Sequence, residues 1–169
     1  HVLMYQAFGW EHPDFCHLPM VMGNDGHKLS KRHGATSCNE FRNNGYLKEA
    51  IINYVAMLGC SYEEGRDMFS LQELGERFNP EHINKAPAIF DYKKLEWFNG
   101  QYMRLKTDEE LFDLTWPFIA NSGMFGEQDQ KARETAGLRF ADQTLLKPTD
   151  EQKSTLMKVM PLIKERLHF

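Results

Sequence analysis

The sequence has 169 residues, of which 41% are hydrophobic and 26% are charged, and its formal net charge is −4. This length and composition are typical of a globular chain with one or two packed cores, and they exclude a largely disordered protein. A slightly acidic chain has no global basic field, so any binding of a polyanion must come from local basic patches.

The three cysteines, Cys16, Cys38 and Cys60, are widely spaced and include no C-x-x-C pair. An odd number at these spacings favours neither a disulfide framework nor a zinc site, and it fits a reducing cytoplasm. No apolar run approaches the roughly 18 residues of a membrane span, so we expect no membrane partner. The chain starts with His1 and a helical pattern without a visible cap, which suggests that it begins inside a larger protein.

The first elements in chain order are a helix over 2–10 and a strand over 15–22. The second segment, FCHLPMVM, is apolar and is followed by an Asn-Asp-Gly turn, as a buried strand would be. The best helical periodicity downstream runs from Leu47 to Leu58 and ends at Gly59. Because no further strand is convincing, the sequence predicts a mainly α-helical fold with one short strand.

Four other helix starts are marked by capping boxes, in which a hydroxyl residue is followed three positions later by an acid or an amide. The pairs are Ser37 with Glu40, Ser70 with Glu73, Thr107 with Glu110, and Thr149 with Gln152.

A cluster of cations, HKLSKRHG at 27–34, follows the predicted strand and is bordered by glycines. Lys28, Lys31 and Arg32 offer two flexible ammonium groups and a guanidinium, and Ser30 adds a hydroxyl, so several phosphate oxygens could be held together. Such cation clamps stabilise charge in phosphoryl and nucleotidyl transfer. The alternative is a solvated basic turn, since short basic clusters are common. The preceding strand and the glycines favour the functional interpretation.

Histidines surround this cluster without forming a metal site. His12 and His17 precede it, and His27 and His33 flank it. Their spacings match no ligand pattern, and the neighbouring lysines would repel a cation. We therefore predict no protein-bound metal.

The motif KLSKR resembles the glutamyl and glutaminyl form of the KMSKS loop of class I aminoacyl-tRNA synthetases. The surrounding run LSKRHGATS (29–37) is similar to bacterial-type glutamyl-tRNA synthetases. The likeness covers about 1–145 and weakens beyond. Further segments stand in the family's order, namely YQAFGW, HLPMVM, FRNNGYLKEAIINYVAMLG, FSLQELGERF and KAPAIFDYKKLEWFNGQYMR. The family's HIGH-type ATP motif and its glutamate-binding residues would lie upstream of His1.

The resemblance implies a glutamate–tRNA ligase that uses ATP, with Mg²⁺, to form glutamyl-adenylate and then transfers glutamate to the 3′ end of tRNA(Glu). In that scheme Lys28 and Lys31 are catalytic and contact ATP. Leu29 anchors the base of the loop, and Ser30 and Arg32 shape the same ATP-binding loop. The implied partners are ATP, glutamate and tRNA(Glu), and the implied enzyme is a cytoplasmic monomer. Chain 1–169 alone is expected to be inactive, because half of the nucleotide site would be absent.

The resemblance also implies three regions. Residues 1–36 would be the C-terminal end of a Rossmann-type catalytic domain with the KLSKR loop, 37–106 a helical stem-contact domain, and 107–169 the start of an all-α anticodon-binding domain. Segment 81–106 carries five Lys and Arg against three Asp and Glu, so contact with the RNA backbone is plausible there.

The candidates for tRNA contact in this basic segment are Lys93, Lys94, Asn99 and Arg104. The alternative for each is an ordinary solvated charge or a helix cap. The aromatic residues beside them, Trp97, Phe98 and Tyr102, are spaced as in a packed helical seam, so we expect them in the core.

Two other functions stay open at this point. One is a glutaminyl-tRNA synthetase or a glutamyl-queuosine tRNA(Asp) synthetase, although the predicted helical stretch 107–169 argues against the latter. The other is a noncatalytic RNA-binding or scaffold module in which KLSKR is only a basic patch. ATP dependence of tRNA binding, or adenylate formation, in the parent protein would exclude the scaffold.

Overall fold

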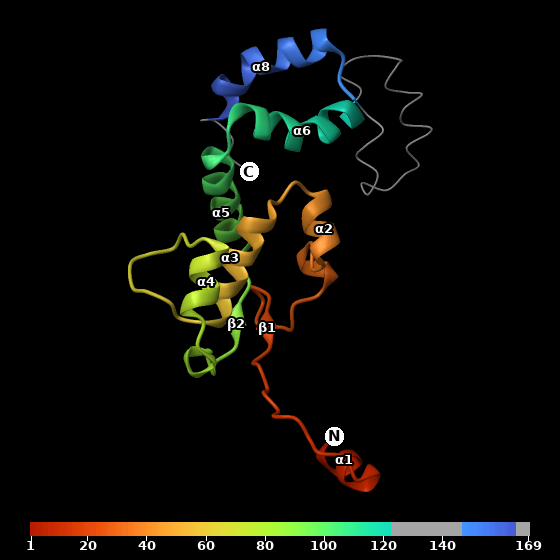
Figure 1. The fold of residues 1–169 in the computed structure, drawn as a ribbon, viewed down its shortest axis with the longest axis vertical. Helices are drawn as coiled ribbons and strands as arrows, with labels where there is room; N and C mark the ends of the chain where they lie inside the picture. The colour runs from red at the N-terminus through yellow and green to blue at the C-terminus, as the bar shows by residue number, and fades with distance from the viewer. Residues whose placement is uncertain (123–146, 165–169) are drawn as a thin grey trace.

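The computed structural model describes residues 1–122 and 147–164, and the fold over these residues is mainly helical (Figure 1). The α-helices are α1 (Val2–Phe8), α2 (Cys38–Asn43), α3 (Lys48–Gly59), α4 (Leu71–Arg77), α5 (Tyr92–Leu105), α6 (Asp108–Ser122) and α8 (Asp150–Lys164). Two 3₁₀ turns, η1 (Lys31–His33) and η2 (Pro80–His82), and two strands, β1 (Val21–Met22) and β2 (Ala88–Ile89), complete the described elements.

The predicted strand over 15–22 is mostly wrong. Only its last two residues pair, in a parallel ladder in which Val21 lies opposite Ala88 and Met22 opposite Ile89. The expectation of one short strand is therefore also wrong, because β2 was not predicted. A strand of two residues is too short to show the alternation by which strands are recognised.

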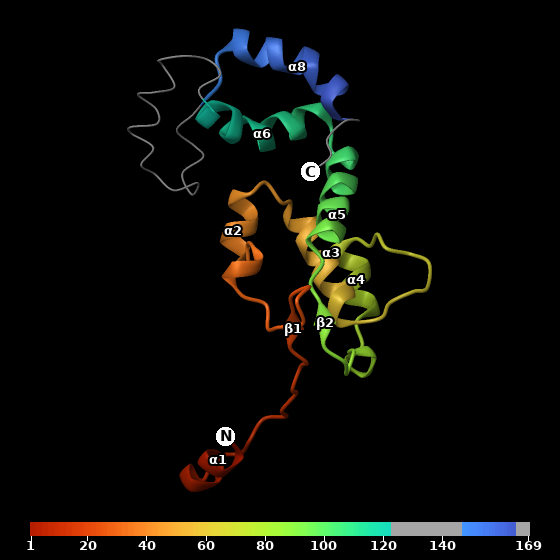
Figure 2. The same cartoon turned by 180° about the vertical axis from the view of Figure 1, so that it is seen from behind.

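The central body consists of α3 and α5, which pack against each other, with α4 beside α3 (Figures 1 and 2). The predicted helix over 47–58 is confirmed, with Leu47 as its N-cap. Its inward face contributes the fully buried Ala50 and the buried Tyr54, and α5 contributes Leu95 and Phe98, both fully buried. Apolar residues at three- and four-residue spacing on both helices thus form one contact seam.

Helices α6 and α8 lie side by side at one end of the molecule, as Figures 1 and 2 both show. Leu111 and Phe112 of α6 and Met160 of α8 are almost completely buried and belong to the same core cluster as the central body. All four predicted capping boxes are present, since each hydroxyl accepts from the backbone nitrogen three residues later.

The N-terminal end of the described structure has a different character. Helix α1 buries none of its residues, and an extended segment joins it to β1 (Figure 1). Along this segment Trp10 is 63% exposed and Leu18 is 66% exposed. Such large apolar side chains normally lie against a partner surface.

No helix among the described residues is long and apolar enough to cross a bilayer.

Candidate nucleotide-binding loop

The cationic loop begins as a tight hairpin directly after β1. The backbone N–H of Gly23 donates to the carbonyl of His27 at 2.7 Å, and the N–H of Leu29 donates to the carbonyl of Val21 at 3.0 Å. Gly26 turns the chain with φ of 74°, a conformation that glycine adopts without strain. Hydrogen bonds of the backbone itself therefore bring Lys28 back beside Met22.

A 3₁₀ turn then carries the second lysine. Ser30 has an extended conformation and precedes η1, which contains Lys31, Arg32 and His33. The N–H of His33 donates to the carbonyl of Ser30 at 2.9 Å, and the N–H of Ser30 donates to the Nδ1 atom of His33 at 3.0 Å. This reciprocal cap satisfies backbone groups that a short turn otherwise leaves free.

Both ends of the loop are fastened to the junction between β2 and α5. At the first end, the N–H of Phe90 donates to the carbonyl of Met22 at 2.8 Å. At the second, the hydroxyl of Tyr92 donates to the carbonyl of Ala35 at 2.8 Å. Gly34 stands with φ of 127°, and a Cβ there would lie 3.2 Å from the Tyr92 ring. A side chain at 34 would therefore be strained and would crowd this attachment.

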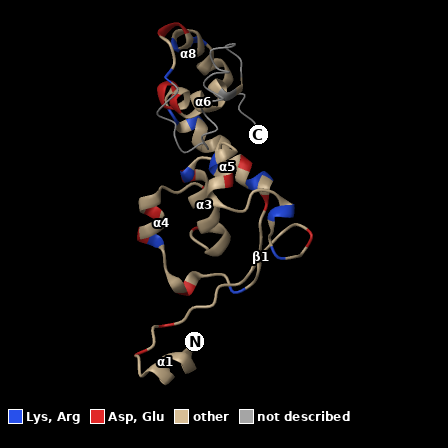
Figure 3. Ribbon diagram, turned by 90° about the vertical axis from the view of Figure 1, so that its right-hand side faces the viewer, with Lys and Arg blue, Asp and Glu red and all other residues tan. Residues whose placement is uncertain are grey.

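Asp25, the acidic residue of the hairpin, accepts contacts from three directions, and the loop after β1 carries both signs of charge (Figure 3). The backbone N–H of His27 donates to Oδ1 at 3.0 Å, Arg32 Nη2 donates to Oδ2 at 3.1 Å, and His33 Nε2 lies 3.0 Å from Oδ1. Mainly the His27 hydrogen bond, and then the contacts with His33 and Arg32, lower the pKa of Asp25 to about 2. Asp25 is therefore an anion at neutral pH.

The two lysines have a different environment. Lys28 and Lys31 are exposed, and within the described part of the chain neither forms an ion pair or a side-chain hydrogen bond. Leu29 between them is partly buried and packs against the core cluster, as expected for an anchor of the loop. Two ammonium groups on a fixed base are available for an anionic ligand.

The four predicted RNA contacts do not all lie on the surface. Lys93 and Lys94 are exposed on α5, Arg104 is partly exposed near its end, and Lys94 Nζ lies 3.5 Å from Asp67 Oδ1. Asn99 is fully buried, so its prediction as an RNA contact is wrong. It lies inside because the backbone groups before α3 need its amide as a partner.

Trp97 was expected in the core and is instead 45% exposed, whereas its neighbour Phe98 is fully buried as predicted and Tyr102 is partly buried. With the Gln101 amide oriented to satisfy its neighbours, its oxygen accepts from Trp97 Nε1 and from Arg104 Nη1, each at 3.2 Å. Positions 93, 97, 101 and 104 follow the helical spacing of three or four, so these side chains share one outer face of α5. This periodicity was the signal that could have placed Trp97 outside.

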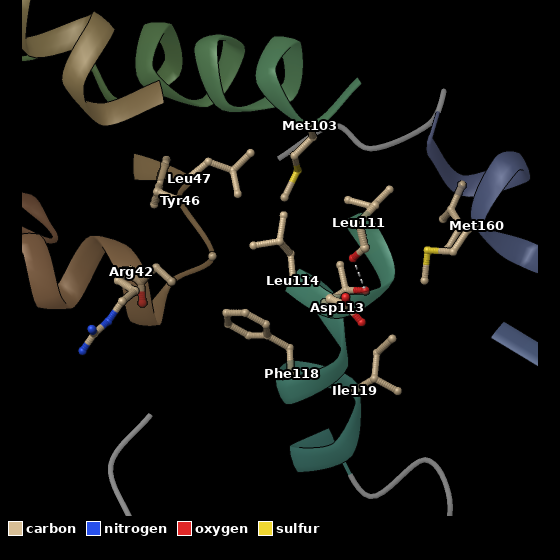
Figure 4. Close-up of a pocket in the computed structure, with 14 residues that line it drawn as sticks. Arg42, Tyr46, Leu47, Met103, Leu111, Asp113, Leu114, Phe118, Ile119 and Met160 are labelled. Carbon is tan, nitrogen blue, oxygen red and sulfur yellow. Dashed lines mark hydrogen bonds between the residues drawn. The ribbon is translucent and has the colours of Figure 1, made fainter. Parts of the chain in front are cut away.

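An apolar pocket of about 420 Å³ lies apart from the loop, and none of the predicted ATP or RNA contacts lines it (Figure 4). Leu47, Met103, Leu114 and Phe118 are among its lining side chains, together with Met160 of α8. The pocket lies between the segment that precedes α3 and the helices α6 and α8. Among the described residues no cluster of His, Cys, Asp and Glu could hold a metal ion.

The sequence reasoning missed Asp25 and His33 as residues that organise the loop. Two local signals could have identified them. Asp25 stands two residues before His27, which is the spacing of an Asx turn, and His33 stands three residues after Ser30, which is the spacing of a capping box.

A family model described as "tRNA synthetases class I (E and Q), catalytic domain" matches residues 1–97. Curated relatives named glutamate–tRNA ligase include one from Treponema denticola, 77% identical over 99% of this chain, and one from Borreliella burgdorferi, 48% identical over 99%. The chain covers 33% and 30% of these two proteins, so it spans about a third of their length.

Solved structures give the same picture. The chain is similar to a crystal structure of a glutamate tRNA ligase from Elizabethkingia meningosepticum in complex with its amino acid, with a TM-score of 0.64 and 30% identity. A glutamate-tRNA synthetase from Elizabethkingia anophelis gives a TM-score of 0.66 at 30% identity. Each match covers 99% of this chain and 32% of the solved chain.

Proposed function

Because the chain belongs to the class I tRNA synthetases for Glu and Gln, we propose that it is part of a glutamate–tRNA ligase. In the first step a carboxylate oxygen of glutamate attacks the α-phosphorus of ATP, which enters with Mg²⁺, and pyrophosphate leaves. In the second step a hydroxyl of the 3′-terminal adenosine of tRNA(Glu) attacks the glutamyl carbonyl, and AMP leaves. The relatives named above favour glutamate over glutamine as the amino acid.

The observation that carries this proposal is the contrast within the KLSKR loop. Its backbone and its residues Asp25, Arg32 and His33 are bound to one another, while Lys28 and Lys31 are exposed and form no ion pair with the described parts of the chain. Lys31 would contact the negative charge that grows as pyrophosphate leaves, and Lys28 would hold the β- and γ-phosphates. Arg32 would act on the shape of the loop, since its guanidinium already pairs with Asp25.

The outer face of α5 would contact tRNA. Lys93, Trp97 and Arg104 share that face, so cations for the phosphates stand beside an exposed aromatic ring on which a base or ribose could pack. We also propose the three-part division at 36 and 106 and a cytoplasmic location, where the exposed thiols of Cys16 and Cys38 would stay reduced.

Exchange of pyrophosphate into ATP, measured for the full-length protein with glutamate and tRNA(Glu) present, tests the first step. Lys31→Ala should lower kcat on the order of 10²-fold, because it removes a contact that is strongest in the transition state. The KM for glutamate should change little. Lys31→Arg should restore only part of the rate, since a planar guanidinium cannot follow a moving phosphate as an ammonium can.

Two controls complete this experiment. Lys85→Ala removes another exposed lysine, which forms no ion pair or side-chain hydrogen bond within the described residues. It should leave the rate unchanged. Chain 1–169 alone should show no exchange. A Lys31→Ala protein with the parental kcat would reduce KLSKR to a basic surface turn.

A further inference from the structure

The imidazole of His33 connects the two halves of the KLSKR loop. On one side its Nδ1 atom accepts the backbone N–H of Ser30 at 3.0 Å, at the start of the 3₁₀ turn. On the other side its Nε2 atom lies 3.0 Å from Asp25 Oδ1, in the hairpin. The side chain of His33 is only 12% exposed, whereas that of Asp25 is 44% exposed, so the ring is shielded from water and the carboxylate is not. In the 3₁₀ turn, Lys31 stands between Ser30, whose N–H the ring accepts, and His33 itself.

Both ring nitrogens of His33 face polar groups of the loop. Nδ1 lies 3.0 Å from the backbone nitrogen of Ser30, which can only donate, and 3.2 Å from the carbonyl oxygen of the same residue, which can only accept. Nε2 faces Asp25 and makes no hydrogen bond within the described residues, so its 3.0 Å approach to Oδ1 is an electrostatic contact.

Gly23 provides the surface against which the ring lies. A Cβ at this position would be 2.7 Å from both Cδ2 and Nε2 of His33, which is closer than such atoms approach. The absence of a side chain at 23 therefore lets the imidazole reach Asp25 and the Ser30 cap together.

We propose that Asp25 and His33 are positioning residues that set the direction of the Lys31 ammonium in the activation step. The inference rests on the proposed function, because it assigns these residues an effect through Lys31. Lys31 is the first residue of the 3₁₀ turn. The N–H of Ser30, which caps this turn, donates to the side chain of His33, which is the last residue of the turn. Asp25 also holds the neighbouring guanidinium of Arg32, whereas Lys28 and Lys31 form no ion pair with any residue that the structure describes.

A double-mutant cycle on pyrophosphate exchange by the full-length protein, with glutamate and tRNA(Glu), tests this role. We expect His33→Ala to lower kcat on the order of tenfold with little change in the KM for glutamate, since a misplaced reacting group costs rate rather than binding. The decisive variant is Lys31→Ala combined with His33→Ala. It should be no slower than Lys31→Ala alone, because without the ammonium its direction has no effect.

A second set of variants keeps the test independent of the His33 side chain. Gly23→Ala should displace the ring and reproduce the tenfold loss while every hydrogen-bonding side chain remains. Gly75→Ala is the matched control, since a Cβ there meets nothing within 4 Å. His33→Asn, whose amide oxygen can still accept the Ser30 N–H, should recover part of the rate that His33→Ala loses. His27→Gln should keep the full rate, because only the backbone of His27 bonds to Asp25.

The outcomes separate the two proposals. Exchange that falls in Lys31→Ala, with a further independent loss in the double variant, would overturn the positioning role and leave the proposed function standing. A full-length protein without exchange would overturn both. Imidazole ¹⁵N signals at pH 8 give a readout apart from activity. We expect Asp25→Asn to shift the Nε2 signal of His33, and an unchanged signal would contradict a contact between these two residues.

Discussion

The side-chain oxygen of Asn99 accepts the backbone N–H of Leu47 at 2.8 Å, although 52 residues separate the two in the chain and both are buried. The amide nitrogen of Asn99 donates to the carbonyl of Gly45 at 3.2 Å. One side chain on α5 thus forms hydrogen bonds with backbone groups of the segment that leads into α3. Helix α3 itself offers these groups no partner. A buried backbone group without such a partner is costly.

Asn99→Ala should therefore lower the free energy of unfolding by about 1–3 kcal/mol, the cost of leaving these buried groups unpaired. Urea titrations followed by circular dichroism measure this change. Asn39→Ala, at an exposed position of α2 whose side chain forms no hydrogen bond with the described residues, should change stability by less than about 0.5 kcal/mol. Equal effects of the two substitutions would contradict the importance of burial at 99.

Asn53 is the second fully buried polar residue, and it joins α3 to the segment before α4. It accepts from the N–H of Phe69 at 2.8 Å and from the hydroxyl of Tyr102 at 2.7 Å, and it donates to the carbonyl of Asp67 at 3.0 Å. Tyr102→Phe leaves two of these bonds intact, so it should cost only about 1 kcal/mol. Asn53→Ala leaves the Phe69 N–H buried and unpaired, so it should cost more than Tyr102→Phe in the same titration.

The stability of the α4 cap should depend on pH in the acid range. The N–H of Ser70 donates to Glu73 at 2.8 Å and Arg66 pairs with the same carboxylate, and in that order these contacts lower the pKa of Glu73 from 4.5 to about 2. A carboxyl whose folded pKa is lowered stabilises the fold above its unfolded pKa. This contribution is lost as the pH falls from about 4.5 towards 2.

Melting temperatures between pH 7 and pH 2.5 measure the effect. Glu73→Gln should melt lower than the parent at pH 7 and should show a smaller decline on acidification, because it has no carboxyl to protonate. Glu64→Gln changes an exposed carboxyl that forms no ion pair or side-chain hydrogen bond within the described residues. The pH dependence of its melting temperature should match that of the parent. A parental profile in Glu73→Gln would show that the cap does not depend on charge.

RNA binding through α5 should have a salt signature. Lys93→Ala should weaken binding of tRNA(Glu) and reduce the slope of log affinity against log salt concentration by about 1, as expected when one phosphate contact is lost. Trp97→Ala should weaken binding without changing this slope, since an indole displaces no counterion. Glu64→Gln changes an exposed carboxyl, which holds no phosphate, and serves as the control. A slope that falls equally in all three variants would contradict a defined contact face.

The local features of the fold could be predicted from the sequence, and the features that need a distant partner could not. Ser37 and Glu40 form their capping box with each other, so four consecutive residues contain the whole interaction. Val21 and Ala88 pair although 66 residues of intervening chain separate them, so no local pattern contains both partners. A pattern confined to 15–22 therefore indicated extended backbone but not how little of it would pair.

The candidate site divides in the same way. The residue types of KLSKR predicted the available cations, because charge and flexibility belong to the side chains themselves. The burial of Asn99 and the exposure of Trp97 depend on how α5 is rotated against α3, which the sequence spacing of aromatic residues did not determine. Asp25 and His33 lie eight positions apart, and their contact needs the intervening hairpin to be built first.

The loop is attached at Met22 and at Ala35, and both attachments are hydrogen bonds to one short segment, Phe90 to Tyr92. That segment directly follows β2 and includes the first residue of α5 (Figure 1). A displacement of α5 along its axis would therefore carry both attachment points in the same direction. The loop would then move as a unit, and its internal bonds would not have to break. A ligand held on the outer face of α5 is in this way coupled to the two lysines through the backbone attachments at Met22 and Ala35.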